Sequence, residues 1–248
     1  MISRMAEITL HVLPPSHPCA AVDAAFALKG LEYERVELPM DGTHIATMEG
    51  IYGAGNNRVP GAVVDGETVY GSNLILERIE QLAPDTHPLY PEPIADQVRE
   101  AARWGDEVLQ PLGRTLPWGA LHFRPDALGL IVGGDILDPA GSDFALRMVR
   151  ALWRRHEISC ARIADELQAL PAHRDHIDSL IAGGVIGNGH TNAADLQIGS
   201  TLAVLLAVGD SAALVGDEKY RRIAETVGLR AGQIPGDAFP PQWVPRPA

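Results

Sequence analysis

The first third of the chain alternates between segments typical of strands and segments typical of helices, and this order limits the possible folds. The apolar segment Ile8–Leu13 has the character of a buried strand. The helix that follows it is predicted to end at Lys29-Gly30, because glycine suits the left-handed position after a helix. A second strand, Tyr33–Leu38, comes after a short turn. We therefore expect these two strands to be parallel, with a right-handed crossover through the helix.

A tight hairpin and a further helix complete this pattern. Asp65-Gly66 stands between Val63-Val64 and Thr68–Tyr70, and an Asp-Gly pair between apolar segments indicates a two-residue turn. Ser72 then lies where it can cap the next helix. Together, these features predict a thioredoxin-like α/β domain over residues 6–84.

The pattern changes after this domain. Four prolines between Pro84 and Pro93 form a stiff connector through which a helix cannot continue. Beyond it we find only helical periodicity, which predicts an all-α domain over residues 94–232 and an extended or loosely packed, proline-rich tail over 233–248. The helices expected from periodicity cover 94–112, 142–170, 175–182 and 217–227.

One segment of the helical region has apolar residues on nearly every face. This segment, Asn192–Val208, is therefore predicted to form a central, buried helix. Asn192 and Asp195, three residues apart, form the pattern of a capping box, in which each side chain accepts a backbone N–H of the other's turn.

Composition excludes several classes of protein. Hydrophobic residues make up 46% of the chain and charged residues 21%, which predicts a well-buried core. The formal net charge of −12 argues against binding to nucleic acid, and the densest basic cluster, 147–155, is interpreted as a solvated helix face. Neither a signal peptide nor an apolar stretch of membrane-spanning length is found, and Cys19 and Cys160 form no disulfide framework. We therefore expect a cytoplasmic protein with no nucleic-acid or membrane partner.

The pieces in this order resemble the glutathione transferase superfamily. The resemblance is carried by Ser16–Cys19 ahead of the first helix, the dipeptide Val59-Pro60, Ser72, and the capping box at Asn192–Asp195. It implies a thioredoxin-like N-terminal domain with an all-helical C-terminal domain, and a role in detoxification. It also implies glutathione or a similar thiol as co-substrate, no permanently bound cofactor, a hydrophobic electrophile as second substrate, and a homodimer.

The resemblance also assigns residues to sites. Ser16 takes the place of the hydroxyl that donates a hydrogen bond to the bound thiolate, and Cys19 is a second candidate for the chemistry. The residues placed around glutathione are His17, Arg58, Val59, Pro60, Gly71 and Ser72, with the Val59-Pro60 bond expected to be cis. The residues placed around the electrophile, chosen because scarce aromatic residues gather there, are Trp104, Arg114, Trp118, His122 and Phe123.

Two departures from the family's pattern stand out. The acidic residue usually found before the serine is Gly71 here, and the basic residues frequent after the nucleophile position are Ala20 and Ala21. Both changes remove polar contacts that a glutathione site could use.

The chemistry leaves alternatives open. A thiol of pKa near 8.5 needs about 2.7 kcal/mol of preferential stabilisation for its pKa to fall by two units, and a helix N-terminus supplies part of this. Either Ser16 activates a bound thiol, or Cys19 is itself the reactive thiolate of a reductase or lyase; a non-catalytic binding protein is the third possibility. No metal site is predicted, since His173 and His176 have no clear third ligand.

Overall fold

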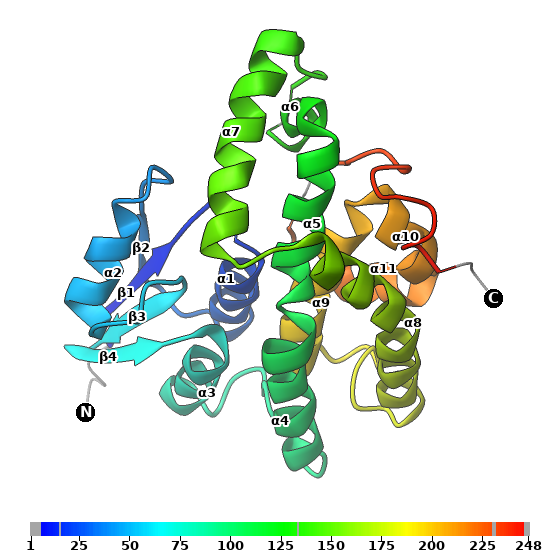
Figure 1. Ribbon diagram of the computed structural model, residues 1–248. Coiled ribbons are helices and arrows are strands. Elements are labelled where there is room, and N and C mark those ends of the chain that lie inside the picture. The colour runs from blue at the N-terminus through cyan, green and yellow to red at the C-terminus, as the bar shows by residue number, and fades with distance from the viewer. Residues whose placement is uncertain (1–5, 15, 133, 230–231, 246–248) are drawn as a thin grey trace.

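The computed structural model describes residues 6–14, 16–132, 134–229 and 232–245. It contains an N-terminal α/β domain followed by a helical domain, as the sequence predicted (Figure 1). The elements of the first domain are β1 (Ile8–Val12), α1 (His17–Lys29), β2 (Glu34–Glu37), α2 (His44–Tyr52), β3 (Gly61–Val64), β4 (Glu67–Tyr70) and α3 (Ser72–Leu82). The second domain contains α4 (Ala95–Trp104), the π-helical turn η1 (Gly105–Leu109), α5 (Leu112–Phe123), the 3-10 turn η2 (Pro125–Ala127), α6 (Leu128–Ile131), α7 (Pro139–Arg155), α8 (Cys160–Ala182), α9 (Ala193–Leu206), α10 (Gly209–Val215) and α11 (Glu218–Glu225).

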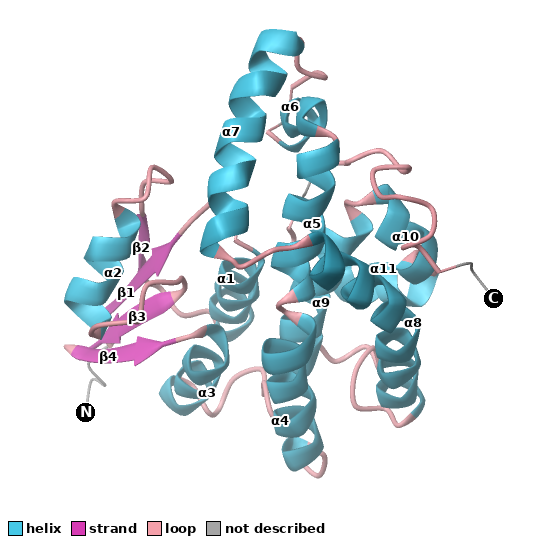
Figure 2. Ribbon diagram, viewed as in Figure 1, coloured by secondary structure: helices cyan, strands magenta, loops and turns pink. Residues whose placement is uncertain are grey.

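The four strands form one mixed sheet in the order β2-β1-β3-β4 (Figure 2). β1 and β2 are parallel, and β3 is antiparallel to both β1 and β4. Asp65 and Gly66 have φ angles of 49° and 85°, the left-handed backbone that a two-residue hairpin turn requires. Gly30 ends α1 in the same region, with φ 63°. These local predictions are confirmed.

Helices cover both faces of the sheet. α1 and α3 lie on the face turned toward the helical domain, and α2 packs on the outer face (Figure 1). Met48 and Tyr52 of α2 are buried there against Leu38. The inner face belongs to a larger apolar core that continues without interruption into the helical domain.

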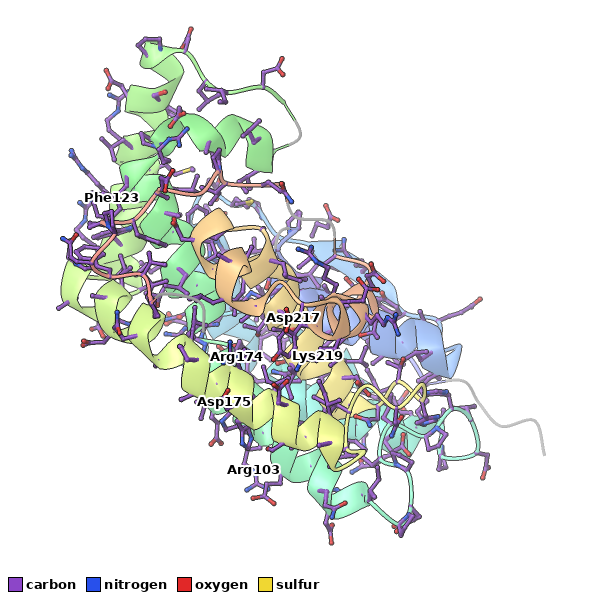
Figure 3. The ribbon with its side chains drawn as sticks, turned by 90° about the vertical axis from the view of Figure 1, so that its right-hand side faces the viewer. Arg103, Phe123, Arg174, Asp175, Asp217 and Lys219 are labelled. Carbon is purple, nitrogen blue, oxygen red and sulfur yellow. The ribbon has the colours of Figure 1, made fainter. Side chains whose placement is uncertain are left out.

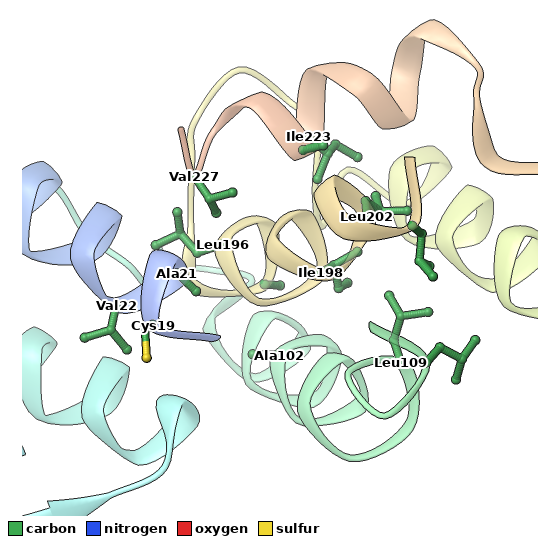
Figure 4. Close-up of a cluster of buried hydrophobic side chains, with 14 of the residues drawn as sticks. Cys19, Ala21, Val22, Ala102, Leu109, Leu196, Ile198, Leu202, Ile223 and Val227 are labelled. Atoms are coloured by element: carbon green, nitrogen blue, oxygen red, sulfur yellow. The ribbon is translucent and has the colours of Figure 1, made fainter. Parts of the chain in front are cut away.

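Helix α9 is the centre of that core. It packs against α1, α4, α5 and α11, so it joins the two domains (Figure 4). Its capping box is formed as predicted, with Asn192 as N-cap and Asp195 as its partner. Leu196, Ile198 and Leu202 are each fully buried.

Two predicted helix boundaries in the helical domain are wrong. The segment 142–170 is not one helix, because the chain turns between α7 and α8 at Glu157, whose φ is 52°. The break expected after residue 170 does not occur, since α8 continues through Pro171 to Ala182 with Leu167, Leu170 and Ile177 buried. Periodicity alone does not show which side of a proline packs on the core.

The tail is also more tightly bound than predicted over its described part. Ile234 forms a β-bridge with Val208. The Asp210 carboxylate accepts the backbone N–H groups of Asp237 and Ala238 at 3.1 and 2.9 Å, and Phe239 is buried. None of the described helices combines the length and apolar character needed to cross a membrane.

Candidate functional site

Three segments of the N-terminal domain leave the sheet at one edge. His11 of β1 pairs with Gly61 of β3, and Gly61 pairs with Tyr70 of β4. The turn after β1, the dipeptide before β3 and the start of α3 are therefore neighbours in space. This register brings Ser16, Val59-Pro60 and Gly71-Ser72 to the same edge, where the resemblance places a thiol site.

Ser16 stands immediately before α1 with an extended backbone, φ −78° and ψ 114°. It is the N-cap residue, but its side chain accepts no hydrogen bond from the helix. Pro18 lies in the first turn and has no N–H to be satisfied. Ser16 is half-buried, and its hydroxyl makes no capping bond with the helix.

Cys19 lies in the first turn of the same helix but points into the core (Figure 4). Its side chain is 1% exposed. Burial raises the pKa of the thiol to about 12, against the opposing effect of a hydrogen bond with Ser16. A thiol that is protonated at neutral pH and closed to solvent is a poor nucleophile, so the structure argues against Cys19 as the reactive group.

His17 is a second residue whose predicted role is not supported. It is 4% exposed and packs against α5, where a Cβ on Gly113 would come within 2.8 Å of its ring. Burial, with a smaller contribution from the nearby Arg114, lowers the pKa of His17 to about 3. His17 is thus a neutral contact between the two domains and no ligand for glutathione, because a tightly packed interface excludes the ligand.

The Val59-Pro60 dipeptide has the expected geometry at the sheet edge. The peptide bond is cis, and Pro60 is buried. The Pro60 carbonyl accepts the N–H of Gly71 at 3.1 Å. Within the described part of the chain, the backbone N–H and C=O of Val59 have no hydrogen-bond partner. They are therefore free to pair with an extended peptide.

Ser72 differs from its prediction. It is the first residue of α3 and does not cap it; the N-cap is Gly71, whose backbone at φ 92° and ψ 144° favours glycine. This backbone gives a physical reason for the absence of an acidic side chain at position 71. The Ser72 hydroxyl is 2% exposed and donates to Asp106 Oδ1 at 3.3 Å.

A buried polar network surrounds that hydroxyl. Gln197 on α9 donates to Ser72 Oγ and to Asp106 Oδ1, both at 3.0 Å, and Gln110 donates to Asp106 at 2.6 Å. Asp106 lies on the π-helical turn η1, which replaces the α-helical continuation predicted over 94–112. The Ser72 hydroxyl thus links the two domains and is not accessible to a ligand. The backbone N–H groups at the start of α3 are not part of this network.

A cavity of about 290 Å³ lies where the domains meet. Its walls come from the loop before β3, from α5, and from the α7–α8 connection. The lining residues are Arg58, Pro111, Arg114, Thr115, Arg155, His156, Glu157 and Arg162. Arg58 connects this cavity to the sheet edge described above, because it immediately precedes Val59 in the sequence.

Of the residues predicted around the electrophile, only Arg114 lines this cavity. Trp104 packs on His176, with ring centroids 4.3 Å apart. His122 stacks on Trp153, and the Trp153 indole donates to the Trp118 carbonyl at 2.8 Å. These rings thus take part in helix packing, and their role around an electrophile stays a prediction. Phe123 likewise packs on Trp243.

Sequence reasoning missed Arg155, His156 and Arg162. The only signal was the arginine density of 147–155, interpreted as a solvated face. Arg147, Arg150 and Arg154 are indeed exposed, but Arg155 turns toward the cavity. Among the described residues, no group of three or more His, Cys, Asp or Glu side chains could hold a metal ion.

The comparisons with known proteins agree with this architecture. Residues 10–87 match the family described as the N-terminal domain of glutathione S-transferase. No curated protein matches the chain in sequence.

Solved glutathione transferases share the fold at low sequence identity. Glutathione transferase F7 from Populus trichocarpa is 15% identical, with a TM-score of 0.54 over 89% of this chain and 99% of its own. GSTFuA3 from Phanerochaete chrysosporium is 17% identical, with a TM-score of 0.52 over 90% and 92%. A GST-like protein from Pseudomonas syringae is 20% identical, with a TM-score of 0.50 over 97% and 77%. The chain thus has the glutathione transferase fold, and its residues 10–87 are similar to the N-terminal domain of glutathione S-transferase.

Proposed function

We propose that this protein is a glutathione-dependent transferase that activates a small thiol through Ser16 for attack on an electrophile. The observation that carries the proposal is the sheet edge at which three groups converge. The first is the Ser16 hydroxyl, which makes no capping bond. The second is the backbone N–H and C=O of Val59, which have no hydrogen-bond partner beside the cis bond, and the third is the start of α3. Each suits a different part of a thiol tripeptide.

The thiol sulfur would lie at the N-terminus of α1. Free N–H groups and the positive end of the helix dipole favour an anion there. The Ser16 hydroxyl donates a further hydrogen bond to the sulfur. Lowering a thiol pKa by two units takes about 2.7 kcal/mol, which one hydrogen bond to a charged group and the helix dipole together supply.

The remaining parts of the peptide follow from the backbone. Val59 pairs with the central residue of the thiol in the manner of an added strand. A carboxylate of the ligand is held by the N–H groups that begin α3, because the Ser72 hydroxyl is already bonded to Asp106. Tight binding therefore depends on main-chain groups more than on side chains.

Conjugation of glutathione with 1-chloro-2,4-dinitrobenzene tests this proposal. We expect Ser16→Ala to lower kcat about 100-fold, because it removes one donor to a developing anion. Calorimetric affinity for S-methylglutathione, which has no thiol to activate, should be unchanged. Ser16→Thr, which keeps the hydroxyl, should retain most of the activity.

A different result would point to another function. If neither glutathione nor S-methylglutathione binds, the fold serves another ligand. If Ser16→Ala keeps full activity, the hydroxyl is not the activating group.

A further inference from the structure

Four guanidinium groups surround the cavity between the domains. Arg58 precedes β3, Arg114 lies on α5, Arg155 ends α7, and Arg162 lies in the first turn of α8. These residues come from four separate segments of a chain whose net charge is −12. Such a gathering of like charges is unfavourable unless something offsets it.

Within the described part of the chain, Arg58, Arg114 and Arg155 form no salt bridge, whereas Arg162 pairs with Glu166 at 2.8 Å. The outer face of the helical domain is different (Figure 3). Two basic groups there have acidic partners: Lys219 pairs with Asp178 at 2.6 Å and Arg174 with Asp175 at 3.3 Å. The lining of the cavity includes one carboxylate, the exposed Glu157. The cavity therefore has an excess of positive charge.

Neutral acceptors hold the arginines in place. Arg155 donates to the Asn57 carbonyl at 3.0 Å, and Arg114 donates to Gln110 Oε1 at 2.9 Å. A neutral acceptor orients a guanidinium without cancelling its charge. The remaining N–H donors of both groups are thus positioned and still charged for a ligand.

These charges also influence one another. Burial, with a smaller contribution from the charge of Arg58, lowers the pKa of Arg114 to about 10. Burial also lowers the pKa of His156 to about 4, with Arg114 and Arg155 adding to the effect. An anion placed between the arginines would relieve this repulsion.

Thr115 also lines the cavity, but its hydroxyl is buried beside Glu166 and adds nothing to the positive charge of the lining.

The cavity also adjoins the thiol site. Arg58 is next to Val59 in sequence, and Arg114 follows Gly113, which contacts His17 directly behind Ser16. A volume of about 290 Å³ is near the lower end for a small-molecule site. It suits a compact ligand such as a single substituted ring.

We propose that this cavity binds the oxyanion of an anionic electrophile, so that the second substrate is a carboxylate-bearing compound and not a purely hydrophobic one. The inference rests on the proposed transferase function. In the reaction, the thiolate sulfur forms a bond to the electrophilic carbon, and the bond from that carbon to its leaving group breaks. A halide leaves with its electron pair, the thiol proton passes to solvent, and the carboxylate is unchanged.

A matched pair of electrophiles tests the proposal. The probes are 4-chloro-3,5-dinitrobenzoate and its methyl ester, and each kcat/KM is divided by the uncatalysed rate with glutathione. We expect a 10- to 100-fold preference for the acid, as one charge-assisted hydrogen bond is worth about that factor. Arg155→Gln should reduce this preference at least tenfold and leave the ester unaffected. Arg154→Gln removes an exposed arginine next to Arg155 and should change neither rate.

Glutathione itself carries carboxylates, so a second comparison separates the two sources of the oxyanion. With glutathione and its glycine ethyl ester as thiols, the Arg155 variant should alter the KM of neither. If the variant instead raises the KM of glutathione to that of its ester, the cavity binds the thiol substrate and the proposal falls. Equal rates for acid and methyl ester in the unaltered protein also overturn it.

Direct binding distinguishes this inference from the function on which it rests. Calorimetry with 3,5-dinitrobenzoate, which has no leaving group, needs no turnover. If it binds the unaltered protein at least tenfold more tightly than Arg155→Gln while no electrophile is conjugated, the anion site stands and the transferase function falls. If conjugation proceeds and 3,5-dinitrobenzoate does not bind, the transferase function stands and the anion site falls. An unchanged urea denaturation midpoint for each variant excludes loss of folding as the cause.

Discussion

Helices α9 and α1 each begin with a polar N-cap residue, but the two N-cap side chains have different roles. At α9, Asn192 accepts the N–H groups of Ala194 and Asp195 at 2.9 and 3.2 Å. Asp195 in return accepts the N–H of Asn192 at 3.0 Å and that of Gly187 at 2.7 Å. At α1, the N-cap residue Ser16 makes no such bond with its side chain.

The difference shows how one structural motif serves stability in one place and a ligand in another. The capping groups of α9 are fully buried, so any N–H without a partner there would be costly. The start of α1 is at the sheet edge, where a ligand can take the place of a capping side chain. We therefore expect changes at α9 to alter stability and changes at Ser16 to alter activity.

The largest effect on stability is expected at the N-terminus of α9, where the capping groups are buried. Asn192→Ala removes two accepted hydrogen bonds and the donor to the Val185 carbonyl, all of them buried. Unfolding free energy measured in urea should fall by about 3 kcal/mol. Asp138→Ala, which removes a single exposed cap bond to Gly141, is the control and should cost about 1 kcal/mol. Equal losses in the two variants would contradict this account of α9.

At the start of α1, His17 should make stability depend on pH. Its pKa is about 3 in the folded protein against 6.5 for an unperturbed histidine, because burial disfavours the charged ring. Between these values the unfolded chain binds a proton that the folded chain does not, so stability falls as the pH falls. From pH 6.5 to pH 5 this loss is about 2 kcal/mol.

The variant His17→Gln isolates that contribution, since other groups titrate as well. Urea denaturation at pH 6.5 and pH 5 should show a smaller acid loss for the variant than for the unaltered protein. The same loss in both proteins would mean that His17 is protonated without unfolding.

A smaller effect is expected for the two cysteines. Cys19→Ala should cost about 1 kcal/mol through lost packing and leave conjugation unchanged. In the folded protein, Cys160 is exposed and should react with a thiol reagent, whereas Cys19 should react only after unfolding. A glutathione adduct on Cys19, seen by intact mass after treatment with oxidised glutathione, would restore the reductase interpretation.

The smallest stability change is expected at Ser16 itself. Ser16→Ala removes no cap bond, so unfolding free energy should change by less than about 0.5 kcal/mol. A loss comparable with that of Asn192→Ala would show that the hydroxyl has a structural role and would remove the contrast between the two helices.

Much of the fold was predictable because its signals are local. The Asp65-Gly66 turn, the end of α1 at Gly30 and the capping box at Asn192 each depend on residues within one turn of the chain. The helix boundaries near Glu157 and Pro171 were not, since packing against distant segments overrides local preference there.

The candidate site was less predictable. The family pattern placed Ser16 and Val59-Pro60 at the sheet edge, and the register brings them together. It also suggested roles for His17 and Ser72 that burial excludes, because both side chains are used in contacts between the domains. Position in a motif does not show whether a side chain faces a ligand or another domain.

The amino-acid sequence by itself determined the element order of the first domain, the hairpin, the end of α1 and the capping box of α9, since these follow from interactions between near neighbours. Only the tertiary structure decided that Cys19 is buried and that Arg58, Arg114 and Arg155 share a cavity. The reason is physical: burial and the repulsion of like charges are sums over all surrounding groups, and those groups come from segments far apart in the chain.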